Sequence, residues 1–221
     1  MGIIIGVGGV GGVGKFDENK FEGVGTIQGG VYKKLEIDGV CSIEGDIKAD
    51  SLSFEGVCTC YGNVEAESFE CDGVLTINGN LRAGTADIDG VVTVNGDKVE
   101  ADRIDCDGLL SVNGEISADV IEADGKLNAK EIVGDRIRIK SYWRQGIAAL
   151  LFKIGGKSEK GIKFSVVDLI EGTTVELRGV RAKSVNGHDV TIVKNCNIDR
   201  VDAGGELSIA PSSIVGEIVN K

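Results

Sequence analysis

The chain has 221 residues and a formal net charge of −11, with 34 glycines, one proline and few aromatic residues. A chain this acidic lacks the basic footprint on which nucleic-acid binding depends, so we expect no nucleic-acid partner. No apolar stretch is long enough to span a membrane as a helix, and no secretory signal peptide is expected at the start.

Residues 1–20 form a glycine-rich opening segment that imitates two nucleotide-binding motifs. Residues 6–11 fit the G-x-G-x-x-G pattern, and residues 9–15 fit the G-x-x-x-x-G-K phosphate loop. Both motifs require a helix next, whose N-terminal amides hold the phosphate. Here Phe16 stands where the phosphate loop needs a hydroxyl, and a β repeat begins soon after it. We therefore expect a flexible glycine-rich tail and no nucleotide cofactor.

Residues 21–140 repeat one short pattern, which indicates a solenoid whose units bury their apolar faces by stacking. The first glycines of the units recur every 16 to 18 residues: Gly23, Gly39, Gly56, Gly73, Gly90, Gly108 and Gly125. Each complete unit has six apolar sites in three pairs, as in Leu75 and Ile77, Leu81 and Ala83, Ala86 and Ile88. A spacing of two is the period of a strand, so each pair predicts one short strand with two inward side chains. The main solenoid is therefore predicted to be an all-β, triangular β-helix with about 17 residues per turn. The unit at Gly23 is one residue short, and its predicted inward sites include Gly25 and Lys33.

The β pattern is interrupted over residues 141–163, where a short inserted helix or loop is predicted. Five apolar residues are spaced as one helical face: Trp143, Ile147, Leu150, Leu151 and Ile154. From Lys140 to Lys163 there are six basic residues and one acid, a net charge of +5. A basic amphipathic segment of this kind either lies on an anionic membrane or packs against the solenoid and caps its end. The repeat then returns in degraded form, which predicts a shorter C-terminal β-solenoid segment over 164–221.

The six cysteines fall at inward sites of the repeat: Cys41, Cys58, Cys60, Cys71, Cys106 and Cys196. Buried cysteine behaves as a small apolar residue, and free interior thiols are typical of a reducing cytoplasm. Cys58 and Cys60 could begin a metal site, but no second cluster of cysteine or histidine completes four ligands. We expect six free thiols, no metal and a cytoplasmic location.

Two ladders and one histidine are the remaining candidates for chemistry. An acid precedes each main glycine, as in Asp72 and Asp89, and either forms a cation-binding stripe or marks a repeated turn with solvated carboxylates. An outward ladder of hydroxyl residues runs along the first strand of each unit: Thr26, Ser42, Thr59, Thr76, Thr93 and Ser111. The β-propensity of an exposed strand explains this ladder better than a threonine array of the ice-binding type does. His188 is the only histidine. It could serve as the base of a β-helix acyltransferase, but the sequence shows no carboxylate–histidine constellation and no hexapeptide period around it.

The repeat resembles the bactofilins, the bacterial polymer-forming cytoskeletal family. The resemblance is carried by residues 72–83, which read Asp-Gly-Val-Leu-Thr-Ile-Asn-Gly-Asn-Leu-Arg-Ala, and is echoed by residues 44–49 and 113–118. It implies a right-handed β-helix that polymerises end to end without nucleotide into nonpolar filaments near the membrane, with roles in cell shape, polar scaffolding and motility. The later segment, with residues 168–172, looks like the two-part proteins of this type in Gram-positive bacteria.

Three functional hypotheses follow from these patterns. The first is a non-enzymatic, self-assembling scaffold, because the end of a solenoid exposes unpaired backbone and an apolar cross-section that must be capped or joined. The second is a monomeric binding module whose partner uses the acid or hydroxyl face. The third is a β-helix enzyme built around His188. We expect the protein to bind copies of itself, with the membrane surface as a further partner through residues 141–163.

Overall fold

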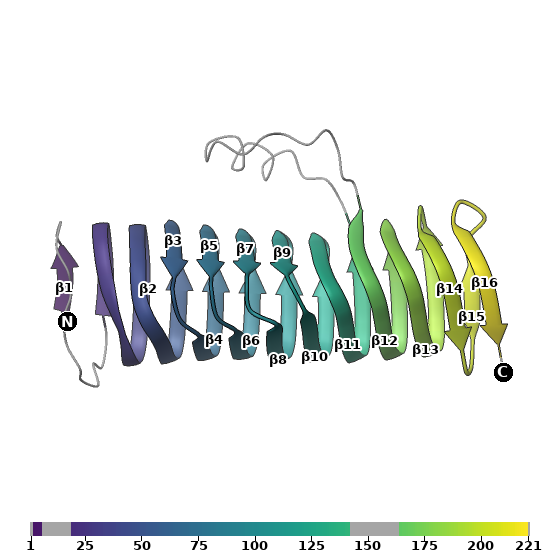
Figure 1. Cartoon of the computed structure of the whole chain (residues 1–221), viewed down its shortest axis with the longest axis horizontal. Coiled ribbons are helices and arrows are strands. Elements are labelled where there is room, and N and C mark those ends of the chain that lie inside the picture. The colour runs from purple at the N-terminus through teal and green to yellow at the C-terminus, as the bar shows by residue number, and fades with distance from the viewer. Residues whose placement is uncertain (1, 6–18, 142–163, 221) are drawn as a thin grey trace.

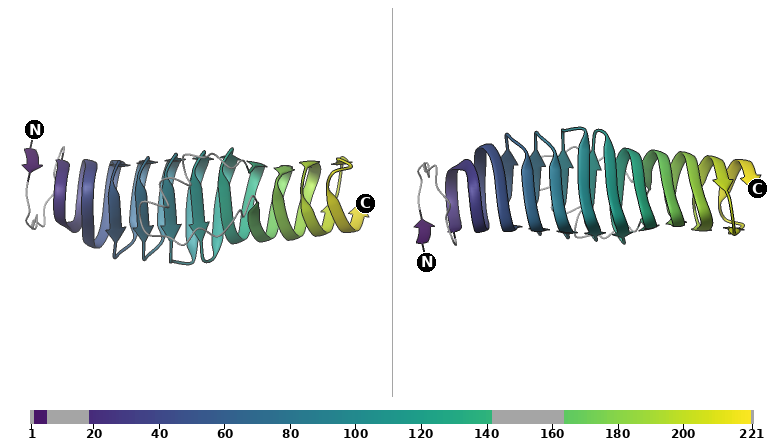
Figure 2. Two further views of the ribbon diagram at one scale, coloured as in Figure 1. Left: turned by 90° about the horizontal axis from the view of Figure 1, so that it is seen from above. Right: turned by 90° about the horizontal axis from the view of Figure 1, so that it is seen from below.

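The computed structural model describes residues 2–5, 19–141 and 164–220, and these residues form strands and no helix (Figure 1). The strands are β1 (Gly2–Ile5), β2 (Asn19–Phe54), β3 (Val57–Cys60), β4 (Val64–Cys71), β5 (Val74–Ile77), β6 (Leu81–Ile88), β7 (Val91–Val94), β8 (Lys98–Cys106), β9 (Leu109–Val112), β10 (Glu115–Ala123), β11 (Lys126–Lys140), β12 (Ser165–Arg178), β13 (Val180–Lys194), β14 (Asn197–Ala203), β15 (Leu207–Ile209) and β16 (Ile214–Asn220). The strand pairings are parallel, and successive turns of the chain stack on one another along one rod (Figure 2). The predicted all-β solenoid is confirmed.

Each turn has three sides because the long strands contain a bend. In β4, Val64, Ala66, Phe69 and Cys71 are buried, whereas the two residues between the pairs, 67 and 68, are both exposed. Two successive outward side chains break the strict alternation of a straight strand, so the chain turns a corner there. Together with the short strand β3, the two halves of β4 form the three predicted sides. The register Leu52↔Phe69 repeats after 17 residues, as the sequence predicted.

The interior is a set of apolar columns that run the length of the rod. Phe54 and Phe69 pack with ring centroids 5.9 Å apart, and the side chains above them in the following turns are equally buried. In the short first turn the buried side chain is Tyr32, whereas Lys33 is exposed. The prediction of an inward Lys33 was therefore wrong. Because the first unit is one residue shorter than the others, Tyr32 takes the inward site instead of Lys33. The charged ammonium of Lys33 therefore stays out of the apolar column.

Polar side chains at one corner link successive turns. Asp46 accepts hydrogen bonds from the backbone N–H of Asn63 at 2.7 Å and from its side-chain amide at 3.1 Å. Asn63 in turn accepts from the backbone N–H of Asn80 at 2.9 Å, and Asn80 accepts from that of Lys98 at 3.1 Å. These side chains satisfy corner amides that the strand ladders leave unpaired.

The main-series glycines stand where the backbones of adjacent turns approach most closely. A Cβ atom on Gly108 would lie against the carbonyl oxygen of Gly90, far inside van der Waals contact, whereas one on Gly204 would meet nothing within 4 Å. We expect Gly108→Ala to lower the free energy of unfolding by about 1–3 kcal/mol, because only a backbone shift relieves the clash. Gly204→Ala should stay within about 0.5 kcal/mol of the parent. Urea denaturation of both variants checks this, and equal stabilities would contradict the close approach.

The two solenoid segments form one continuous stack. Strand β12 pairs with β11 from Asn128↔Val166 to Lys140↔Arg178. Where the chain leaves and re-enters the stack, the hydroxyl groups of Ser141 and Ser165 lie 2.7 Å apart, and Ser165 also accepts from the backbone N–H of Leu127 at 3.0 Å. The buried pair therefore preserves the ladder across the insertion. The predicted helical face, with Trp143, Ile147, Leu150, Leu151 and Ile154, lies outside the described residues.

One part of the glycine-rich opening segment has a defined place. Residues 2–5 form β1, which adds a parallel strand to the first turn in the register Gly2↔Asn19 to Ile5↔Glu22. The prediction of a flexible tail over residues 1–20 therefore does not describe residues 2–5, which form β1, or residues 19 and 20, which begin β2. The two nucleotide-binding patterns lie in residues 6–15, which are outside the described part of the chain.

Candidate functional site

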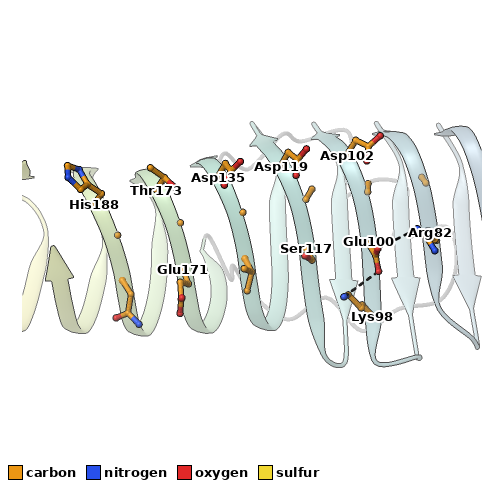
Figure 3. A pocket seen from close by; sticks show the side chains of 18 residues that line it. Arg82, Lys98, Glu100, Asp102, Ser117, Asp119, Asp135, Glu171, Thr173 and His188 are labelled. Carbon is orange, nitrogen blue, oxygen red and sulfur yellow. Dashed lines mark ion pairs between the residues drawn. The ribbon is translucent and has the colours of Figure 1, made fainter. Parts of the chain in front are cut away.

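A groove of about 750 Å³ runs along the outside of the rod (Figure 3). Its floor is the column of small residues that begins with Ala83 and continues through Ala101, Ala118, Gly134, Gly172 and Gly187. The alanine side chains of this column face the interior of the rod, so backbone forms the floor. The outward side chains on either side of the column form the walls. The groove therefore crosses from the main solenoid into the C-terminal segment.

The two walls of the groove differ in chemistry. On one wall Lys98 forms ion pairs with Glu100 at 3.3 Å and Glu115 at 3.4 Å. The other wall places Asp102, Asp119 and Asp135 one above another in successive turns. Five acidic and two basic residues line the groove, so its field favours a cationic ligand.

His188 lies at one end of the groove and has a carboxylate partner. Its Nδ1 is 3.0 Å from an oxygen of Asp189, which also accepts the backbone N–H of Glu206 at 2.9 Å. The backbone hydrogen bond from Glu206 and then the contact with His188 lower the pKa of Asp189. The sequence showed no carboxylate–histidine constellation, and the structure places one carboxylate, that of the adjacent residue, beside the imidazole. Residues 188 and 189 occupy the bend of β13, where two successive side chains point outward. Besides His188, the groove lining includes the hydroxyl-bearing residues Ser117 and Thr173 and contains no cysteine.

The acid ladder lies along one corner of the rod and is crowded in its middle. Asp87 lies beside the ladder member Asp89, and its pKa is raised first by burial and then by the neighbouring charges of Asp89 and Asp105. Within residues 2–5, 19–141 and 164–220, no group of three or more His, Cys, Asp or Glu side chains is arranged to hold a metal ion. In the hydroxyl ladder, Thr26 and Ser42 lie 3.1 Å apart across adjacent turns. Their contact joins two turns.

The cysteines occupy the predicted inward sites, but two of them are joined. Cys41 and Cys58 form a disulfide between adjacent turns, with their Cα atoms 4.7 Å apart. The expectation of six free thiols was wrong, because stacking by one turn places two cysteines of the same column within bonding distance. The argument for a reducing compartment is weakened accordingly. Cys60, Cys71, Cys106 and Cys196 are free and buried. Burial raises the pKa of Cys71 and of Cys106 to about 12, so both thiols stay protonated at neutral pH.

The two ends of the rod differ in how well the apolar columns are covered. At the N-terminal end, Phe21 and Ile27 are each 2% exposed. At the C-terminal end, Ile218 stands in the inward column above Val201, yet it is 53% exposed. No described strand pairs with the outer edge of β15 or β16. The C-terminal end is thus an apolar surface bordered by unpaired backbone.

None of the described segments forms a helix of sufficient length and hydropathy to cross a bilayer. Comparisons of the chain with protein-family models, with curated proteins and with solved structures gave no match.

Proposed function

We propose that this protein is a non-enzymatic, self-assembling scaffold that polymerises through the ends of its β-solenoid without nucleotide. The observation that carries the proposal is the exposed inward column at the C-terminal end, where Ile218 is 53% exposed and Val201 beneath it is fully buried. Exposed strand edges with apolar side chains readily pair with another chain. The resemblance of residues 72–83 to the bactofilins supports the same proposal and adds a cytoplasmic role in cell shape at the membrane surface.

Two substitutions on one strand test the role of this end. We expect Ile218→Asp to raise the concentration needed for assembly by roughly two orders of magnitude, because burying an unpaired carboxylate in the contact costs several kcal/mol. Ile214→Asp is the matched control, since Ile214 lies on the same strand and is also exposed, but it pairs in register with the outward residue Asn197.

The measurement is negative-stain electron microscopy combined with sedimentation, in buffer free of nucleotide and divalent metal. Filaments from the parent chain and from Ile214→Asp, but not from Ile218→Asp, are the expected result. A parent chain that remains a monodisperse monomer at high concentration would rule the proposal out.

A monomeric binding module is the second candidate, and the groove is the observation that favours it. Its acidic lining would suit an extended cationic partner. If the parent chain stays monomeric, this candidate takes precedence, and substitution of Asp119 by Asn would be the first test of the groove.

A further inference from the structure

The first and last turns of the described solenoid carry inward residues of the same apolar columns. Gly23 lies against Gly39 and Thr26 against Ser42, each sixteen residues apart, which places Phe21 in the same column as Ile37 and Phe54. That column continues through the register of each following turn and ends at Ile209 in β15. By the same spacing, Ile27 belongs to the column of Ile43, which ends at Val215 in β16.

This phase has a consequence for two copies of the chain. The first turn of one copy, placed over the last turn of another, would set Phe21 over Ile209 and Ile27 over Val215. Every apolar column would then continue across the junction, and the strands would keep the parallel pairing found throughout the rod. A contact between two ends turned toward each other would instead bring equivalent edges together in antiparallel orientation.

Strand β1 already occupies part of this junction. It pairs with Asn19–Glu22, the side of the first turn that carries Phe21. In the junction of two copies, β15 of the neighbour would lie at that place, because β15 ends the same column. One edge cannot pair with two strands, so β1 and the neighbour's β15 exclude each other.

We infer that the N-terminal edge of the rod binds the C-terminal end of a second copy head to tail, and that β1 must leave this edge before the contact forms. The inference rests on the proposed assembly through the ends and adds its polarity and its control. Head-to-tail contacts use two different surfaces and generate an open, polar filament. This polarity differs from the nonpolar filaments that the resemblance to the bactofilins implies. While β1 is bound, the edge is closed to a second copy. The apparent affinity of one copy for the next is therefore the intrinsic affinity multiplied by the fraction of chains in which the edge is free.

Engineered cysteines test the polarity. In the head-to-tail junction Lys20 would be the register partner of Ser208, with Cα atoms about 4.8 Å apart, which is within reach of a disulfide. We expect the double variant Lys20→Cys with Ser208→Cys to give a ladder of covalent multimers on oxidation. The two sites lie at opposite ends of the rod, so the bond cannot form within one copy (Figure 1). Each single variant should give no dimer. Covalent dimers from Ser208→Cys alone would show that C-terminal ends meet each other and would overturn the inference.

A substitution in β1 tests the control. Ile4→Pro removes a backbone N–H from the middle of the four-residue strand, and Ile4→Val keeps both the N–H and the β-branched side chain. We expect Ile4→Pro to lower the concentration needed for assembly about tenfold or more. This factor follows if the N-terminal edge is free of β1 in about 10% or less of the parent chains. Ile4→Val should match the parent chain.

An unchanged or raised assembly concentration for Ile4→Pro would overturn the role of β1. Failure of every variant and of the parent chain to assemble would instead reject the proposed function itself. Assembly with the wrong cross-linking pattern rejects the head-to-tail contact alone.

Discussion

Phe69→Ala is expected to lower the free energy of unfolding by about 3–5 kcal/mol, which is the range for removing a buried aromatic side chain. Phe69 is 1% exposed and packs on Phe54. Its neighbours in the column are Leu52 in the turn before and Ala86 in the turn after. The side chain of Ala86 is too small to fill the space that the Phe69 ring would leave, so the cavity persists.

The adjacent residue supplies the control for this substitution. Glu70 is exposed on the same strand, and Glu70→Ala should change the free energy of unfolding by no more than about 0.5 kcal/mol. Urea denaturation at concentrations below the onset of assembly measures both variants, because association would add to apparent stability. A loss of less than about 1 kcal/mol for Phe69→Ala would contradict a tightly packed column.

Reduction of the Cys41–Cys58 bond is expected to cost about 3 kcal/mol, the value for a closed loop of this size. The bond links turns that are 17 residues apart, so its loss frees the unfolded chain rather than breaking contacts in the folded one. Both cysteines are buried, and reductant reaches them only when the turns open. Denaturation with and without dithiothreitol gives the difference in stability.

Thiol titration distinguishes the bonded from the reduced chain. The denatured protein should show four reactive thiols before reduction and six afterwards, because four of the six cysteines are free. A double variant, Cys41→Ala with Cys58→Ala, should be insensitive to dithiothreitol. Six thiols in the unreduced protein would contradict the bond.

The groove shows why a functional surface of a solenoid is hard to find in its sequence. Asp102 and His188 line one groove although they are far apart in the chain, and the insertion at 142–163 separates them. The sequence pattern predicted a separate C-terminal segment, whereas the groove exists because β12 stacks directly on β11. The His188–Asp189 pair had a signal in the sequence, since both residues follow Gly187 at the position of the bend. Strict strand alternation would have placed the two side chains on opposite faces.

The sequence by itself determined the type of fold. The three apolar pairs between one main glycine and the next can be buried together only if the chain bends between the pairs and each turn stacks on the next. The sequence also placed the cysteines in the interior, since their phase in the repeat is that of Ile and Leu. The tertiary structure alone decided which surfaces meet. Whether Cys41 bonds to Cys58, whether β11 continues into β12, and which end of the rod leaves Ile218 exposed all depend on contacts between turns. A repeat reports the phase of each residue within its turn, whereas the contacts between adjacent turns and the covering of the ends are set by the whole stack.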